Sequence, residues 1–286
     1  MKIRVMKQAL MSFVTMALVS ASVFAVASTD TVLTEVIAGD WRSAAEKSRD
    51  AARKTIENLQ FWGLKPGASI LEVQPGAGWW TRILAPYAAR TGGRYTATAA
   101  DLANPSITEA ARQGRADFAA RFADEKIYGK VELVNWGATA APLAANNYDF
   151  ILLSRVIHGW IRVEGLVDRN FVSLAGSLKP GGVLAVEQHR ENPGPQDPMA
   201  ESGYVTEAFV IEAAEKAGLR LADRSEINAN PKDTKDHPFG VWTLPPTRIT
   251  VPYGSGKAPD PNFDRSKYDA IGESDRMTLR FVKAAP

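Results

Sequence analysis

The chain of 286 residues contains no cysteine, and this absence excludes several kinds of chemistry at once. Without thiols the protein forms no disulfide, uses no thiolate nucleophile and builds no zinc–sulfur site. Histidine is scarce, with three residues in total, so each one is easy to follow. The composition of 45% hydrophobic and 23% charged residues is typical of a soluble globular protein of one or two domains.

The first 27 residues have the pattern of an export signal. Basic residues stand at Lys2, Arg4 and Lys7, and an uncharged, largely apolar run over residues 9–27 ends in Ala25-Val26-Ala27. Small residues in an Ala-x-Ala arrangement are typical of a signal-peptidase site. The alternative is an uncleaved anchor, because the run approaches the roughly 20 residues that span a bilayer. We predict cleavage before Ser28, a periplasmic or secreted protein, and no stable membrane anchor after cleavage.

Removal of this leader changes the charge of the protein. The whole chain has a net charge of +2, and the leader carries three positive charges and no acidic residue, so the remainder is −1. The basic isoelectric point therefore reflects targeting rather than a surface for nucleic acid. The sequence therefore predicts no nucleic-acid partner.

The segments after residue 65 alternate between β-rich runs and helical patterns. Strands are predicted at 69–73, 94–98, 131–136, 148–154, 183–187, 219–227 and 277–282, and helices at 79–89, 106–123, 163–178 and 206–217. Such alternation predicts an α/β fold with a doubly wound, mostly parallel seven-stranded sheet. In such sheets the ligand lies beyond the carboxyl ends of the strands, at the switch point beside the first strand.

Two flanking regions complete the predicted organisation. A helix is predicted over 40–62, and its Arg42, Arg49 and Arg53 are interpreted as a solvated face, or alternatively as a face across a cofactor. Residues 228–275 are rich in proline, glycine and charge, with 240–244 strand-like, and a loop of this length is typical of a lid. The predicted parts are 1–27 signal peptide, 28–65 helical segment, 66–227 Rossmann-like core, 228–275 irregular lid and 276–286 last strand with tail.

The stretch from Ser69 to Thr81 is the main candidate for a binding site. It consists of an apolar strand with Glu72, a turn with Gly76 and Gly78, and the start of a helix. Glycines let the backbone turn tightly and approach a ligand, and the helix directs its free N–H groups at that point. This pattern is typical of a cofactor cradle, although two glycines after a strand also occur in plain turns.

Six motifs in order resemble the class I, Rossmann-like S-adenosylmethionine-dependent methyltransferases. The resemblance covers about 66–227 and the final strand, and its motifs are Glu72 with Gly76 and Gly78, Asp101 after the second strand, 131–149, Val156-Ile157-His158, Leu178-Lys179-Pro180-Gly181-Gly182-Val183-Leu184, and Glu215-Lys216-Ala217-Gly218-Leu219. The leader and the tail with Asp236-His237-Pro238 are similar to an exported bacterial branch of predicted methyltransferases. The family implies S-adenosylmethionine as cofactor.

The resemblance also implies which residues bind the cofactor. These are Glu72, Gln74, Gly76, Gly78, Asp101, Trp136 and Ser154. Glu72 either contacts the cofactor or fixes the glycine turn, and Asp101 is placed to bind the ribose hydroxyls. Two positions depart from the family: Gln74-Pro75 replaces its first glycine, and Gly137 stands where an acid reads the adenine. Trp136 beside Gly137 either stacks on adenine or belongs to the core.

The histidines are the candidate catalytic groups. His158 follows the fourth predicted strand and His189 the fifth, so the two are expected to converge on the substrate side. Histidine is the natural general base near neutral pH. The alternative is a pair of buried histidines that bond backbone carbonyls. Together with Glu187 they match no recognised metal-ligand spacing, so no metal is predicted, and His237 is interpreted as turn chemistry.

The leading hypothesis is an S-adenosylmethionine-dependent methyltransferase that acts on a small molecule in an extracytoplasmic compartment. The alternative is a non-catalytic periplasmic binding protein on the same fold. A nicotinamide dehydrogenase ranks lower, because Thr81 replaces the third glycine of its fingerprint. An apolar or aromatic acceptor follows if the aromatic residues Trp79, Trp80, Trp160, Tyr204 and Trp242 line the pocket rather than the core.

Overall fold

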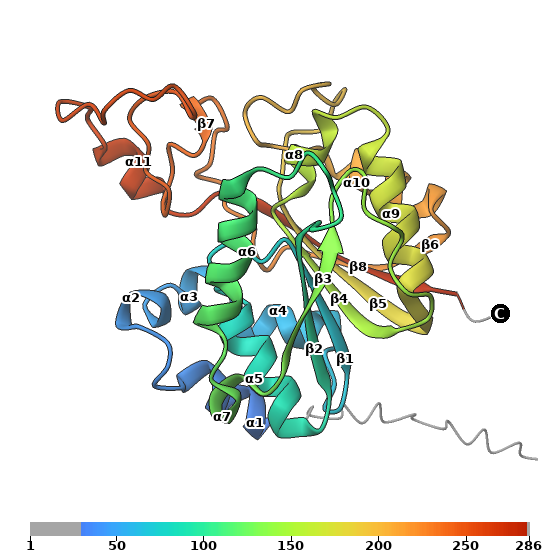
Figure 1. The fold of residues 1–286 in the computed structure, drawn as a ribbon. Helices are drawn as coiled ribbons and strands as arrows, with labels where there is room; N and C mark the ends of the chain where they lie inside the picture. Colours follow the sequence, from blue (N-terminus) through green and yellow to red (C-terminus); the bar gives the residue numbers. More distant parts are fainter. Residues whose placement is uncertain (1–29, 285–286) are drawn as a thin grey trace, which may run out of the picture. The chain divides into compact units, whose positions relative to one another are not determined.

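A seven-stranded sheet with the strand order β3-β2-β1-β4-β5-β8-β6 forms the centre of the molecule (Figure 1). The structure is a computed structural model that describes residues 30–284, so the predicted signal peptide lies outside the described residues. The strands are β1 Ser69–Val73, β2 Arg94–Ala100, β3 Val131–Trp136, β4 Tyr148–Ser154, β5 Leu178–His189, β6 Leu219–Ser225 and β8 Arg276–Lys283. From β3 to β5 in this order, each strand pairs in parallel with its neighbour. Strand β8 pairs antiparallel with both β5 and β6. The predicted doubly wound, mostly parallel sheet is confirmed.

Helices cover both faces of this sheet, as Figure 1 shows. Consecutive residues of β1 explain the two layers: Ile70 enters one hydrophobic cluster and Leu71 the other, because side chains alternate along a strand. The first cluster includes residues of α1, α4 and α5, and the second includes residues of α8, α9 and α10. The bounds after β1 are α5 Thr81–Thr91, α6 Glu109–Arg121, α7 Glu125–Tyr128, α8 Ile157–Ile161, α9 Leu166–Ser177 and α10 Glu207–Lys216.

The N-terminal segment contains several short helices, so the single helix predicted over 40–62 is wrong. The helices are α1 Thr31–Ala38, α2 Ala44–Lys47, α3 Asp50–Arg53 and α4 Thr55–Trp62. Ser43 caps α2 by accepting a hydrogen bond from the Glu46 N–H. Lys54 has a left-handed backbone, at φ +49°, and separates α3 from α4. A left-handed residue breaks the regular helical hydrogen bonding. The change of direction carries α4 against the sheet.

The predicted solvated arginine face is wrong as well. Arg42 and Arg53 are each 2% exposed. Arg42 forms an ion pair with Asp50 at 2.6 Å. The arginines would share one exposed face on a single straight helix. Because the helix is broken, Arg42 and Arg53 are buried instead.

Residues 228–275 are largely irregular, and they contain β7 Pro238–Val241 and α11 Ser266–Ile271. Two contacts anchor the ends of this segment to the core: the Tyr204 hydroxyl donates to Asp233 at 2.9 Å, and Arg190 pairs with Asp275 at 2.9 Å. Among residues 30–284, no helix combines the length and the apolar character that crossing a membrane requires.

Candidate active site

The glycine turn follows β1 and lies where the sheet changes direction. β2 pairs with one edge of β1 and β4 with the other, so this turn is at the switch point. Gly76 and Gly78 have φ +58° and +79°, a region that favours glycine. A Cβ on Gly78 would lie 2.3 Å from the Phe122 ring, whereas a Cβ on Gly76 would meet no described atom within 4 Å. Gly78 therefore serves packing, and Gly76 leaves open space at the turn.

Gln74 holds the position where the family has its first glycine. It keeps the left-handed backbone, with φ +49°, although it carries a side chain. Its N–H donates to Thr98 Oγ1 at 2.8 Å, and its side-chain Oε1 accepts from Trp160 Nε1 at 2.7 Å. The bond to Trp160 joins the turn to α8 across the switch point.

Glu72 lies in β1, just before the turn, and is 3% exposed. Its Oε2 accepts hydrogen bonds from the Tyr95 hydroxyl at 2.6 Å and from Thr81 Oγ1 at 2.8 Å. Burial raises the pKa of Glu72 to about 7, although the two hydrogen bonds act in the opposite direction. These contacts tie β1 to β2 and to the first residue of α5, which favours the interpretation that Glu72 fixes the turn.

A cavity of about 450 Å³ opens beside the turn. Gln74, Gly76, Ala100, Arg115 and Trp136 are among the residues that line it. Trp136 ends β3 and also lines a second cavity, of about 470 Å³, on the side of α9. Trp136 also packs against the second hydrophobic cluster, so it contributes both to the core and to the walls of these cavities.

Asp101 directly follows β2, which is two residues longer than predicted and ends at Ala100. Asp101 is 7% exposed, and its Oδ1 accepts from the Ala103 N–H at 2.9 Å. It lines a cavity of about 550 Å³, and Ala100, directly before it in the chain, lines the cavity beside Gly76. A Cβ on Gly137 would lie 3.9 Å from the Asp101 Cβ, so a side chain fits at this position.

Ser154 ends β4 and belongs to a polar group deeper in the site. Its Oγ donates to Glu187 Oε2 at 2.7 Å and accepts from Trp80 Nε1 at 3.3 Å. The serine therefore connects the residues after the glycine turn with β5. In the structure Ser154 therefore bonds Glu187, whereas the family resemblance implies that it binds the cofactor.

His158 and His189 come together, with ring centroids 6.2 Å apart. Burial, followed by the charges of Arg162 and Arg155, lowers the pKa of His158 to about 4. Burial and Arg155 also hold the pKa of His189 well below its usual value. Both imidazoles are therefore neutral at pH 7 and able to accept a proton.

The surroundings of these histidines are partly polar and partly aromatic. His189 Nδ1 lies 2.6 Å from Ser274 Oγ, and the Trp242 ring lies 5.8 Å from that of His158. His237 is elsewhere: its Nε2 lies 2.8 Å from Asp233 Oδ1, within the anchor of residues 228–275. Within residues 30–284, no group of three or more His, Cys, Asp or Glu side chains has an arrangement that could hold a metal ion.

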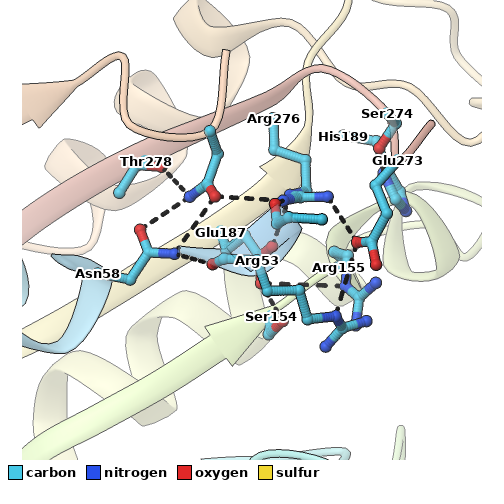
Figure 2. A network of polar contacts seen from close by, with 12 residues as sticks. Arg53, Asn58, Ser154, Arg155, Glu187, His189, Glu273, Ser274, Arg276 and Thr278 are labelled. Atoms are coloured by element: carbon cyan, nitrogen blue, oxygen red, sulfur yellow. Dashed lines mark hydrogen bonds and ion pairs between the residues drawn. The ribbon is translucent and has the colours of Figure 1, made fainter. Parts of the chain in front are cut away.

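A cluster of charged side chains lies beyond the ends of β4 and β5, and we name it the arginine cluster. Its members are Arg49, Arg53, Arg155, Glu187, Glu273 and Arg276. Figure 2 shows five of them, pointing toward one another from separate segments of the chain. Despite complete burial, the surrounding arginines lower the pKa of Glu187 to about 2.

Sequence reasoning missed the arginine cluster. Arg155 directly follows β4, and Arg276 begins β8 opposite His189, so both lie at the sheet edge where ligands bind. A charged residue immediately after a buried strand was the available signal for Arg155. No local pattern indicated that Arg53 is buried, because its position depends on the break at Lys54.

Comparisons with known proteins agree with this architecture. A family model described as a methyltransferase domain matches residues 71–186. A putative sarcosine dimethylglycine methyltransferase from Galdieria sulphuraria is similar in structure, with TM-score 0.51, 14% identity, and coverage of 85% of this chain and 88% of that chain. The N-methyltransferase NodS from Bradyrhizobium japonicum has TM-score 0.47, 15% identity and coverage of 85% and 98%. At 14% identity, the similarity to the Galdieria sulphuraria protein concerns the fold alone. A search of curated proteins found no match.

Proposed function

We propose that this chain is a class I S-adenosylmethionine-dependent methyltransferase that methylates a small molecule in an extracytoplasmic compartment. The observation that carries the proposal is the open space at Gly76, beside a cavity and at the switch point of the sheet.

The residues of the turn fit the cofactor that the family implies. A ligand can approach the backbone at Gly76, where an added Cβ would meet no described atom within 4 Å. The adjoining cavity of about 450 Å³ is in the range of sites for small molecules and has Trp136 in its wall. We propose that Gly76 and Trp136 hold the cofactor, that Asp101 binds its ribose, and that Glu72 and Gly78 keep the turn in shape.

S-adenosylmethionine supplies a methyl group on a positively charged sulfur, so the protein mainly has to align two reactants. Correct orientation contributes about 7–11 kcal/mol to such reactions. A general base adds about 10²–10⁴-fold where the acceptor carries a proton. His158 and His189 are neutral at pH 7 and lie together, so they are placed to take that proton. The low pKa of His158 makes it a modest base.

Titration of the purified, folded protein with S-adenosylhomocysteine tests cofactor binding directly. We expect saturable binding in calorimetry, and we expect Gly76→Ala to weaken it, since the new methyl group would occupy the open space at the turn. Arg112→Ala is a control, because Arg112 is exposed on α6 and pairs with Glu109 of the same helix. A folded protein that binds neither S-adenosylhomocysteine nor S-adenosylmethionine would disprove the proposal.

The export part of the proposal depends on the basic and apolar leader pattern of residues 1–27. Fractionation of the producing bacterium, followed by N-terminal sequencing, tests it. We expect the protein in the periplasm or the medium, starting at Ser28. A cytoplasmic protein that retains its leader would contradict this localisation.

A non-catalytic binding protein is the second candidate, and one contact favours it. The Gln74 side chain fills the family's glycine position and bonds to Trp160, which joins the two sides of the switch point. Screening cell extracts for transfer of labelled methyl groups separates the two candidates. Methylated product would exclude a purely binding role.

A further inference from the structure

The arginine cluster contains more positive than negative charge. Four arginines and two glutamates meet there, so two positive charges are in excess at full ionisation. Four of the six side chains, all except Arg49 and Arg155, have 8% or less of their area exposed. Charges that leave water are stable only when they are paired and hydrogen-bonded. The balance of the cluster is therefore unusual for a purely structural network.

The two carboxylates are already occupied by two of the arginines. Arg49 donates to Glu273 Oε1 through Nε at 2.9 Å and Nη2 at 2.7 Å. Arg276 donates from Nη1 to Glu273 Oε2 at 2.8 Å, and its Nε lies 2.7 Å from Glu187 Oε1. Glu187 Oε2 accepts from Ser154 in addition. Arg53 and Arg155 are thus left with only distant carboxylates.

Arg53 is the more buried of these two, with 3% of its side chain exposed. Its Nε lies 3.6 Å from Glu273 Oε2, and its Nε and Nη1 have no hydrogen-bond partner among residues 30–284. The guanidinium lies 4.3 Å from the centre of the Trp79 ring, next to the glycine turn. Burial, and then the charge of Arg155, lower the pKa of Arg53 to about 9. Buried polar groups are nearly always hydrogen-bonded, and within the described part of the chain Arg53 is the side chain with two buried nitrogens that lack a partner.

Arg155 faces the same region and connects it with solvent. Its side chain is 21% exposed, and its Nε, 3.9 Å from Glu187 Oε2, has no hydrogen-bond partner within the described part of the chain. The backbone is left-handed, at φ +57°, and the Arg155 N–H donates to the Glu187 carbonyl at 2.7 Å. Non-glycine residues held in this region concentrate at functional sites.

We propose that Arg53 and Arg155 bind an acidic group, a carboxylate or a phosphate, of the methyl acceptor. The planar guanidinium matches both groups with two parallel hydrogen bonds, which explains donors without partners and the excess positive charge. The proposal rests on the proposed methyltransferase function and specifies its substrate class as small organic acids.

The position of the cluster suits this role. Arg155 follows Ser154 at the end of β4, and Arg53 lies over Trp79, one residue after Gly78 of the glycine turn. The charge of Arg155 also acts on both His158 and His189. An acidic group held by the two arginines therefore places the rest of the acceptor near both the turn and the histidines.

The first test compares the unfolding temperatures of wild type and Arg53→Met. Removing an unmatched buried charge is expected to raise the unfolding temperature of the free protein by about 2 °C or more, because similar apolar replacements of buried charges often stabilise. Acetate, benzoate, inorganic phosphate and phenyl phosphate should stabilise wild type and leave Arg53→Met unchanged. Arg112→Met, on the exposed face of α6, should behave as wild type. An Arg53→Met protein that is less stable and retains the response to acids overturns the proposal.

The second test measures affinity in Arg155→Gln, which keeps a polar side chain at the accessible position. We expect the affinity for the tightest-binding acid of the panel to fall at least about tenfold, as for loss of a charge-assisted bidentate pair, while S-adenosylhomocysteine binds as in wild type. Comparing benzoate with phenyl phosphate distinguishes carboxylate from phosphate, and benzamide is the neutral control. If the acids bind no better than benzamide while S-adenosylhomocysteine binds, the anion site is wrong. If the acids bind and S-adenosylhomocysteine does not, the methyltransferase function is wrong.

Discussion

Replacing Glu72 by glutamine should change how the stability of this protein depends on pH. Glu72 is buried, and its pKa in the folded protein is raised from 4.5 to about 7. Between these two values the unfolded chain has released the proton and the folded protein retains it. The stabilisation is therefore fully present below pH 4.5 and is lost as the pH rises through about 7.

The size of the effect follows from the difference between the two pKa values. One pKa unit corresponds to 1.36 kcal/mol, so ionisation of Glu72 lowers the free energy of unfolding by about 3 kcal/mol in alkaline solution. In Glu72→Gln the side chain stays neutral and still offers an oxygen to Tyr95 and Thr81. Between pH 4.5 and about 7, the free energy of unfolding of the variant should therefore rise relative to that of wild type by about 1.4 kcal/mol per pH unit. Above pH 7 the difference between the two proteins should stay constant.

Urea unfolding of both proteins from about pH 5 to about pH 9 measures this difference. The low pKa of His158 makes the folded protein lose stability as the pH falls from 6.5 to about 4. This effect is the same in both proteins, so it cancels in the difference between their free energies of unfolding. Two stability curves that stay parallel over the whole range would refute the reasoning. A large loss of affinity for S-adenosylhomocysteine in Glu72→Gln at neutral pH would instead assign Glu72 to the cofactor.

Three further predictions concern the turn and the site around it. Gly78→Ala should lower the free energy of unfolding by about 2–3 kcal/mol in urea titrations, because its Cβ would lie 2.3 Å from the Phe122 ring; an unchanged stability would contradict the packing. If Asp101 binds the ribose, Asp101→Asn should lower the affinity for S-adenosylhomocysteine in calorimetry. An affinity equal to that of wild type would show that Asp101 does not bind the cofactor. For an acceptor that carries a proton, His158→Asn should slow methyl transfer by about 10²-fold, the low end of the range for a general base, because its low pKa makes it a modest one. The wild-type rate should fall as the pH drops through about 4, and a flat profile would exclude His158.

Local patterns were sufficient to predict the sheet and its switch point. The apolar run of β4 and the glycines after β1 depend on neighbours within a few residues, so they are readable in the sequence. The order of the segments was sufficient to place His158 and His189 near each other, because neighbouring parallel strands end at the same edge. The fifth strand was predicted over 183–187, whereas in the structure β5 also includes Lys179-Pro180-Gly181-Gly182, with a register shift against β4.

Predictions that required long-range contacts failed or stayed open. Arg53 was assigned to a solvated surface, whereas the left-handed Lys54 redirects the chain and buries it against Trp79. Glu72 had two interpretations in the sequence, and only the hydroxyls of Tyr95 and Thr81, brought together by β2 and α5, favour one of them.

The sequence by itself determined the class of fold, the methyltransferase resemblance and the location of the glycine turn. The fold class and the glycine turn follow from periodicity and spacing within short stretches of chain, and the resemblance rests on the residues of its six motifs. Only the tertiary structure decided that the paired carboxylate oxygens lie 3.6 Å from Arg53 and 3.9 Å from Arg155, but 2.7 Å from Arg49 and from Arg276. The physical reason is that burial and charge pairing depend on distances between segments up to 224 residues apart, such as Arg49 and Glu273.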